Sequence, residues 1–257
     1  MLHLMIGYHV PKNEDRHKEY LQCLEDNLNN QYIEKVHIFL ESNRKRPPID
    51  NPKIVYAKVP RKTFADQKKA NIGEFDKSYL SKKESKRVTF ADFFRYAREN
   101  LHGERCIIAN SDIFFGDAVG VISDEKLGDT MLCLTRWDVL DCKAGESTKF
   151  FNRSDSQDAW IFESPMKKEV EEQAGFFLGK MGCDNKIAFL AFNAGLKLTN
   201  PAYQIQAFHR HKVDYRTYLE SDAVDGVRDG DFIKVHPTDD WELSRVGNVA
   251  EFYTEYR

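Results

Sequence analysis

Short apolar runs alternate with amphipathic stretches along most of the chain. Residues 2–9, 36–41 and 53–60 are apolar and rich in β-branched and aromatic side chains, a pattern that predicts strands. Between the first two runs, apolar side chains recur at helical spacing after Asn13, a favourable N-cap residue. This spacing predicts a helix that runs to about Asn29.

The same alternation continues to about residue 211. One helix is predicted over 88–101, with its cap near Thr89, and another over 182–195, which Gly195 ends. The remaining strands are predicted at the start of 105–117 and over 130–140, 159–162, 196–201 and 205–211, and a loop is predicted over 141–157. This order favours an α/β fold with a largely parallel sheet.

Charge divides the chain further. Residues 61–87 carry nine basic and four acidic residues, which is typical of a basic insert. From residue 212 on there are six basic and eleven acidic residues in an irregular pattern. We therefore expect one domain over 1–218, interrupted by the basic insert, and an acidic extension over 219–257 packed on or near it.

Composition excludes several classes of protein. The chain has 257 residues, a net charge of −3 and 41% hydrophobic residues, which excludes a disordered or fibrous chain. No apolar run approaches the roughly 18 residues of a membrane span, and the N-terminal run lacks the basic start of a signal peptide. Five cysteines without a CxxC pair favour reduced thiols, so we expect a cytoplasmic protein.

Ligands on parallel sheets bind beyond the carboxyl ends of the strands, and polar residues occur there. Asn110, Ser111 and Asp112 follow the apolar run CIIA. A carboxylate with small polar neighbours suits Mg²⁺ or Mn²⁺ and leaves positions open for substrate phosphates. The alternative is a strand-end turn in which Asp112 caps the next segment.

Two further carboxylates have a chemical and a structural interpretation each. Asp158 precedes a short apolar strand, where it could bind a sugar hydroxyl or take its proton, or be a solvated loop acid. Asp184 opens a helix, whose dipole is expected to stabilise its ionised form. It could be a general base or an ordinary N-terminal aspartate.

Histidine and aromatic residues near the predicted strand ends complete the candidates. His209 and His211 point the same way on a strand, and either could join Asp112 around a metal ion or be structural. Trp137 could stack on a sugar or base, or belong to the core. The chain has no P-loop, dinucleotide-binding, zincin or serine-hydrolase motif.

Several short motifs occur in an order that resembles a known family. They are IGYH, RVTFADFFRYARENL, IIANSDIFF, LCLTRWDVL, SQDAWIF, FFLGKMGCDNKIAFLAFNAGLKLTNP and FHRH. Over about residues 2–218 this order resembles the GT-A-fold glycosyltransferases of large DNA viruses, phages and bacteria. The resemblance implies a mostly parallel central sheet flanked by helices, a nucleoside-diphosphate sugar as donor and a divalent cation, Mn²⁺ or Mg²⁺, as cofactor.

The resemblance also assigns roles. Asp112 would hold the cation with His209 or His211, although Asn110 stands where the common Asp-X-Asp motif has its first aspartate. Asp184 would be the base, with Asp158 as the rival. The residues expected to contact the donor are Tyr8, His9, Arg87, Asn110, Ser111 and Trp137.

Neither the motifs nor the resemblance identifies the acceptor of the sugar. A glycan, a lipid-linked sugar or a protein is one possibility, and hydroxymethylated DNA, contacted through basic residues 61–87, is another. Two other classes compete with the transferase. One is a noncatalytic module that binds a nucleotide sugar or nucleic acid, and the other is a metal-dependent phosphodiesterase that uses Asp112, Asp158 and the two histidines.

Overall fold

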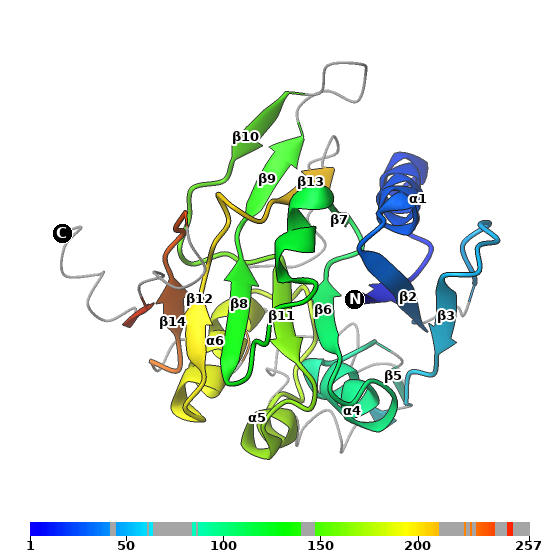
Figure 1. Cartoon of the computed structure of the whole chain (residues 1–257). Helices are drawn as coiled ribbons and strands as arrows, with labels where there is room; N and C mark the ends of the chain where they lie inside the picture. The colour runs from blue at the N-terminus through cyan, green and yellow to red at the C-terminus, as the bar shows by residue number, and fades with distance from the viewer. Residues whose placement is uncertain are drawn as a thin grey trace.

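The computed structural model describes residues 1–41, 45–60, 62–63, 84–85, 87–139, 147–210, 224, 227, 230–239 and 246–248. Its centre is a seven-stranded sheet in the order β3-β2-β1-β6-β11-β8-β12 (Figure 1). These strands are β1 (Leu2–Tyr8), β2 (Ile33–Leu40), β3 (Ile54–Ala57), β6 (Arg105–Ala109), β8 (Thr130–Leu134), β11 (Ala159–Glu163) and β12 (Lys197–Thr199). Only β11 runs antiparallel to its neighbours, so the mostly parallel α/β sheet predicted from the sequence is confirmed.

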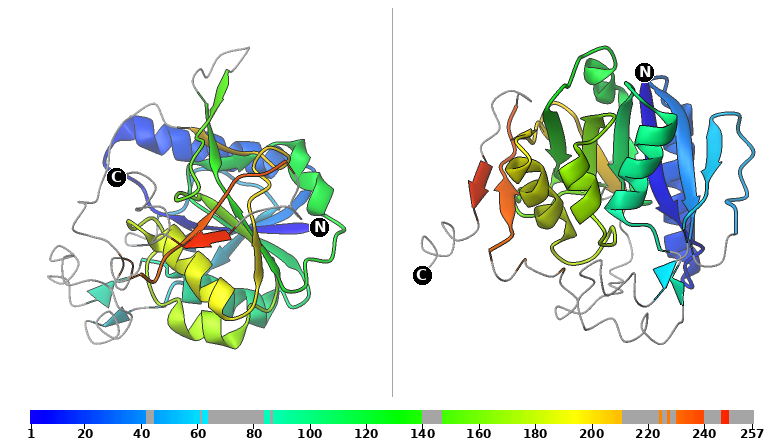
Figure 2. Two further views of the ribbon diagram at one scale, coloured as in Figure 1. Left: turned by 90° about the vertical axis from the view of Figure 1, so that its left-hand side faces the viewer. Right: turned by 90° about the horizontal axis from the view of Figure 1, so that it is seen from below.

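Helices cover both faces of this sheet (Figure 2). Helix α1 (Glu14–Asn29) and the 3₁₀ helix η1 (Asp117–Ile122) pack on one face, and α4 (Phe90–Asn100), α5 (Lys168–Gln173) and α6 (Cys183–Asn193) pack on the other. Alternation along β1 separates the two cores, because Met5 packs with the α4 side while Leu4 and Ile6 pack with the α1 side.

The predicted helix starts are confirmed in detail. The side chain of Asn13 accepts a hydrogen bond from the backbone N–H of Arg16 at 3.0 Å, and Thr89 forms a reciprocal capping box with Asp92. Helix α6 ends two residues before Gly195, whose φ of +81° is the left-handed conformation that favours glycine.

A second, four-stranded sheet in the order β10-β9-β13-β7 lies beyond the main one. It contains β7 (Ile113–Phe115), β9 (Arg136–Val139), β10 (Thr148–Phe150) and β13 (Ala207–Arg210). The prediction of one strand over 130–140 was wrong, because the strand breaks at Thr135. The backbone N–H of Thr135 donates to the Asn200 side chain at 3.1 Å, and its hydroxyl donates to Arg153 O at 2.9 Å, so neither continues a ladder.

The predicted loop over 141–157 was wrong in part. Residues 141–146 lie outside the described part, but β10 lies within the range and pairs antiparallel with β9. Residues 159–162 and 196–201 do form strands, β11 and β12, close to the predicted bounds.

Of the basic insert, the structure describes its two ends and Arg87. Strand β4 (Lys62–Thr63) pairs antiparallel with β5 (Glu84–Ser85), so the two ends of the insert lie side by side. Residues 64–83 lie outside the described part of the chain.

Part of the acidic extension is also described. Strand β14 (Ile233–Val235) pairs antiparallel with β15 (Val246–Asn248). Asp231 forms an ion pair with Lys186 on α6, with 2.5 Å between Oδ2 and Nζ. The side chains of Asn185 and Asn200 donate to backbone oxygens of β14 at 3.1 and 2.9 Å.

The cysteines of the described residues, Cys23, Cys106, Cys133 and Cys183, are buried and form no disulfide, and Cys142 lies outside that part. Across the described helices, none combines the length and apolar character that a membrane crossing requires.

Candidate active site

The polar residues that follow separate strands meet at one edge of the main sheet. Register places Ala109, the end of β6, beside Ile6 of β1 and Ala159 of β11. Because β11 is antiparallel, Asp158 precedes it at the same edge at which Asn110 and Asp112 follow β6. Backbone hydrogen bonds from Asn110 N to Asp158 O at 3.2 Å, and from Asp158 N to Leu134 O at 3.0 Å, fix this arrangement.

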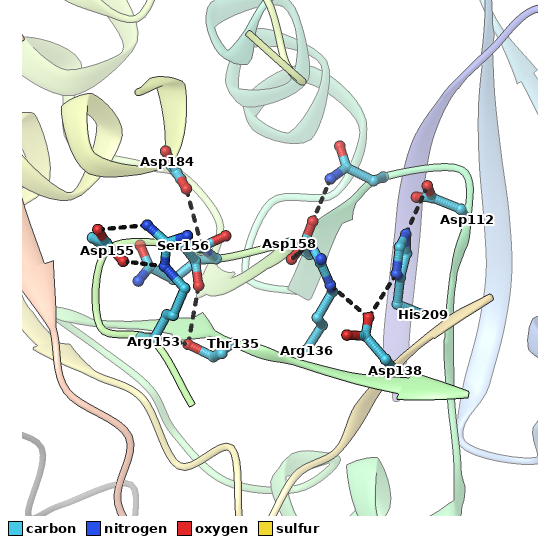
Figure 3. Close-up of polar contacts among 12 residues, drawn as sticks. Asp112, Thr135, Arg136, Asp138, Arg153, Asp155, Ser156, Asp158, Asp184 and His209 are labelled. Atoms are coloured by element: carbon cyan, nitrogen blue, oxygen red, sulfur yellow. Dashed lines mark hydrogen bonds and ion pairs between the residues drawn. The ribbon is translucent and has the colours of Figure 1, made fainter. Parts of the chain in front are cut away.

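At this edge His209 lies between two carboxylates (Figure 3). Its Nε2 atom is 3.1 Å from Oδ2 of Asp112, and its Nδ1 atom is 3.0 Å from Oδ1 of Asp138. Asp112 is 6% exposed and His209 is 5% exposed, so the three groups interact with little screening by solvent. Asp112 follows β6, Asp138 belongs to β9 and His209 belongs to β13.

This arrangement requires positive charge between the carboxylates. A neutral imidazole has one donor and one acceptor nitrogen, so it can donate to only one of them. Burial acts to lower the pKa of His209, but the Asp112 and Asp138 carboxylates outweigh it and raise this pKa to about 9. Burial acts to raise the pKa of Asp112, yet His209 and Arg16 hold it well below its usual value.

Arg136 connects this group to Asp158. Its Nε donates to Asp138 Oδ1 at 2.8 Å and its Nη1 donates to Asp158 Oδ2 at 3.2 Å. The other oxygen of Asp158 accepts a 2.9 Å hydrogen bond from the side chain of Asn110. Both Asp158 oxygens are therefore engaged, and an unbroken chain of contacts leads from Asp112 to Asn110.

Asp184 lies at the start of α6, apart from that chain. Its Oδ2 accepts from the backbone N–H of Gln157 at 3.2 Å and its Oδ1 accepts from that of Asn185 at 3.0 Å. Burial raises the pKa of Asp184 to about 7, and the Asp158 charge acts in the same direction against those hydrogen bonds. Desolvation therefore outweighs the stabilisation of the ionised form that was expected from the helix dipole.

The predicted cation ligands fit a divalent ion in part. An aspartate oxygen and an imidazole nitrogen 3.1 Å apart are suitable neighbours in the shell of Mn²⁺, and the Asp138 carboxylate on the far ring nitrogen is the partner that metal-bound histidines commonly have. Within the described ranges, no group of three or more His, Cys, Asp or Glu side chains could hold a metal ion. His211, the other predicted ligand, lies outside those ranges.

Arg16 is an unpredicted member of the site. Its Nη2 makes a close ion pair with Oδ2 of Asp112, the same oxygen that faces His209. Its Nη1 donates to Glu19 at 2.9 Å, and its guanidinium lies 5.1 Å from the centre of the Tyr20 ring. Three segments far apart in the sequence therefore meet at Asp112.

Among the predicted donor residues, Tyr8 and His9 lie at the end of β1, and Ser111, which follows β6, contacts this strand. Tyr8 is buried and its hydroxyl is 2.8 Å from Nε2 of His17, and burial raises the pKa of Tyr8 to about 12. The His9 ring is 3.4 Å from Glu41 and its side chain is 41% exposed. The hydroxyl of Ser111 donates to the backbone oxygen of Gly7, which ties the Asp112 turn to β1.

Arg87 reaches the same edge from the segment before α4. Its Nη2 donates to Leu178 O at 2.7 Å and to Gly179 O at 3.3 Å. A Cβ atom at Gly179 would lie 3.4 Å from Nη2 of Arg87 and 3.9 Å from Oδ1 of Asn110, so this glycine separates the two side chains closely. Two of the residues predicted to contact the donor, Arg87 and Asn110, therefore both lie close to Gly179.

The side chains of Trp137 and Arg210 contact residues other than Asp112, Asp138 and Asp158. Trp137 projects from β9 away from Arg136 and Asp138, donates to Ala202 O at 2.7 Å and packs 4.9 Å from Phe150 between ring centres. Arg210 pairs with Asp26 at 3.0 Å.

Sequence reasoning missed Arg16, Arg136 and Asp138. The alternation of β9 places Arg136 and Asp138 on one face, and that pattern could have identified the pair. No local pattern could have identified Arg16, because its contact with Asp112 spans 96 positions.

No family model and no curated protein matches the chain. Among solved structures, 4-diphosphocytidyl-2C-methyl-D-erythritol synthase from Anaerococcus prevotii is 10% identical, with a TM-score of 0.43 over 86% of this chain and 94% of that one. The mannosyltransferase PcManGT from Pyrobaculum calidifontis, in complex with GDP-Man and Mn²⁺, is 12% identical, with a TM-score of 0.43 over 84% of this chain and 58% of that one. The galactosyltransferase LgtC, in complex with donor and acceptor sugar analogs, is 12% identical, with a TM-score of 0.41 over 88% and 93%. At these scores the likeness supports no statement about the activity of this chain.

Proposed function

We propose that the protein is a glycosyltransferase that moves a sugar from a nucleoside-diphosphate sugar to an acceptor hydroxyl, with Mn²⁺ or Mg²⁺ as cofactor. The observation that supports this most is the gathering of Asp112, His209, Asp158 and Asp184 at one edge of the sheet. Asp112 and His209 would be the ligands of the cation, and Asp184 would be the separate carboxylate of raised pKa that takes the proton of the hydroxyl.

Asp112 and His209 would hold the cation, and Asp138 would fix the orientation of the His209 ring. When bound, a divalent cation stabilises the negative charge on the departing diphosphate. Arg87 would bind diphosphate oxygens beside it, since its guanidinium and the side chain of Asn110 both lie close to Gly179. Tyr8 and His9, at the end of β1, and Ser111, which follows β6, would border the nucleoside.

Asp184 would be the general base. Its pKa of about 7 lets it be ionised at neutral pH and still accept a proton from a hydroxyl that attacks the anomeric carbon. The bond from that carbon to the diphosphate breaks as the new glycosidic bond forms, and the proton remains on Asp184. Asp158 is the weaker candidate, because Asn110 and Arg136 already engage both of its oxygens.

The acceptor would be a hydroxyl of a glycan. DNA has no support from the described residues, and the basic stretch that prompted the idea lies mostly outside them. Trp137 would not contact the donor's diphosphate, because it projects from the other face of β9.

A donor screen tests the proposal. The protein is incubated with a panel of UDP-, GDP- and TDP-sugars in Mn²⁺ or in EDTA, and released nucleoside diphosphate is measured. We expect release from one donor in Mn²⁺, and a loss of roughly 100-fold or more in Asp112→Asn. Asp15→Asn, at an exposed position of α1, is the matched control and is expected to keep full activity.

Other outcomes would contradict this function. Binding of a nucleotide sugar without any turnover would indicate a binding module. Cleavage of a phosphodiester in Mn²⁺ with no sugar donor would indicate a phosphodiesterase.

A further inference from the structure

Strand β14 of the acidic extension lies alongside α6, the helix at whose start Asp184 lies (Figure 1). Two hydrogen bonds join this strand to the surroundings of the carboxylate. The side chain of Asn185 donates to Ile233 O at 3.1 Å, and the backbone N–H of Val235 donates to Ser154 O at 2.9 Å. Strand β14 therefore contacts both the start of the helix and the loop before β11.

These contacts fall on the residues that bind Asp184. Its carboxylate accepts from the backbone N–H groups of Asn185 and Gln157 at 3.0 and 3.2 Å. Asn185 is also the residue that donates to β14, and the Gln157 side chain donates at 2.8 Å to Ser154 O, the oxygen that β14 binds as well. One strand is thus connected, directly or through one shared oxygen, to both donors of the carboxylate.

All of these groups are buried. Asn185 is 2% exposed, Gln157 is 3% exposed and Ile233 is 4% exposed. Water cannot take the place of a partner that is lost here, so a broken hydrogen bond would leave a buried polar group unsatisfied. The positions of the two backbone donors therefore depend on β14.

Two further contacts anchor the extension to the start of α6. The Asp231 carboxylate pairs with Nζ of Lys186, whose side chain is only 10% exposed. A Cβ atom at Gly182 would lie 2.9 Å from Cγ1 of Val227, so Val227 packs directly on this glycine. The extension therefore holds α6 both before and after Asp184 in the sequence.

We propose that β14 is a positioning element of the active site, which holds the two backbone donors of Asp184 in place and so fixes the carboxylate that would take the proton of the acceptor hydroxyl. Asn185 and Gln157 are positioning residues in this role, because they act through Asp184. The proposal rests on the proposed function for the role of Asp184 as a base, but the positioning itself can be measured without any sugar donor.

The ionisation of Asp184, followed by ¹³C NMR of the carboxyl carbons in the full chain, tests this. Its signal is assigned by comparison with Asp184→Asn. The two N–H donors favour the ionised form, so loosening them should raise the pKa of Asp184. Asn185→Ala removes the donor to β14, and we expect it to raise the NMR midpoint by about 0.5 or more. It should also lower kcat of sugar transfer about tenfold with a smaller change in KM.

Gln157→Met covers the case in which Asn185→Ala does not fold, as judged by circular dichroism. The side-chain oxygen of Gln157 is buried and has no hydrogen-bond partner among the described residues. Methionine is of similar size and removes this unsatisfied acceptor together with the donor to Ser154 O, so the fold should be kept. The Asp184 midpoint should rise in this variant too. A folded variant whose midpoint is unchanged or lower overturns the proposal.

Asn27→Ala is the matched control. Asn27 is also a buried asparagine whose side chain donates to a strand, to Ile113 O at 2.9 Å, but it belongs to α1 on the opposite face of the main sheet. This variant should lose stability and leave the Asp184 midpoint within about 0.2 of wild type, because distant sites act independently. A rise as large as that in Asn185→Ala would show a general loosening of the fold and overturn the proposal.

The variants leave the charges around Asp184 unchanged. The ionisable groups that interact with it are Asp158, Arg153, Cys133 and Cys183, and Asn185→Ala and Gln157→Met keep all of them. Release of nucleoside diphosphate by the wild type is a separate readout. If no donor is turned over, the proposed function fails, and the NMR midpoint still decides whether β14 positions Asp184.

Discussion

Oδ1 of Asp138 lies 3.0 Å from Nδ1 of His209, on the side of the ring opposite to Asp112. The contact fixes the orientation of the ring and keeps Nδ1 protonated. Asp138→Asn should therefore weaken Mn²⁺ binding by about 10- to 100-fold without unfolding the protein. Mn²⁺ titration measures this, and an unchanged affinity would show that Asp138 does not orient His209.

The pH dependence of sugar transfer should follow the ionisation of Asp184. A base is active when deprotonated, so kcat/KM should rise with pH and level off above about 7, the pKa to which burial raises this carboxyl. Asp184→Asn should lower kcat by roughly 100-fold and remove this rise. A variant that kept the rise would assign it to another group, with Asp158→Asn as the next variant to measure.

Asp184 should also affect stability. Its pKa in the folded state is about 7 against an ordinary value of 3.8, so the folded protein binds this proton more tightly than the unfolded chain does. The stability it contributes is present below the ordinary pKa and is lost as pH rises through about 7. As the pH rises from 4 to 8, the free energy of unfolding of Asp184→Asn should rise relative to that of wild type by up to about 4 kcal/mol, since each unit of pKa difference corresponds to about 1.4 kcal/mol. Urea unfolding at both values measures it, and a pH-independent difference would contradict the raised pKa.

Arg136 should act by positioning Asp138 and Asp158, to which it donates at 2.8 and 3.2 Å. Arg136→Gln should lower kcat about tenfold with a smaller change in KM, because a charge-assisted hydrogen bond contributes about 1.5–3 kcal/mol. Arg153→Gln is the matched control, since Arg153 makes a similar pair with Asp155 but its side chain is 55% exposed. Equal losses in both variants would argue against a specific role of Arg136.

Asn27 should be important for stability alone. This residue is 1% exposed, donates to Ile113 O at 2.9 Å and accepts from Phe115 N at 3.1 Å, so it joins α1 to β7. Asn27→Ala should cost about 2–4 kcal/mol, because both buried backbone groups lose their partner. Asn29→Ala, exposed on the same helix, should change stability by less than about 0.5 kcal/mol. Chemical unfolding of both variants compares them.

Much of the fold was predictable because its signals are local. The periods of the apolar residues and the caps Asn13 and Thr89 determine where α1 and α4 begin. The break at Thr135 was not predictable, since TMLCLTRWDVL is β-favouring throughout and the groups that bind Thr135 come from Arg153 and Asn200.

The site divides in the same way. Asp112 follows β6, so the rule for parallel sheets placed it at the carboxyl edge, whereas Asp158 reaches this edge only because β11 is antiparallel to β6. The contact of Arg16 with Asp112 depends on the rotation of α1 against the sheet, which no pattern encodes. The direction of the Asp184 pKa depends on burial, which only the packed structure reveals.

The pairing of β4 with β5 joins the two ends of residues 64–83. When both ends of a segment lie side by side, its length can change at small cost, because the entropy lost on closing a loop increases only slowly with loop length. Arg87 follows two positions after β5, and its hydrogen bond to Leu178 O holds it independently of residues 64–83. We therefore expect residues 64–83 to tolerate replacement by a segment of another length, with Arg87 still bound to Leu178 O.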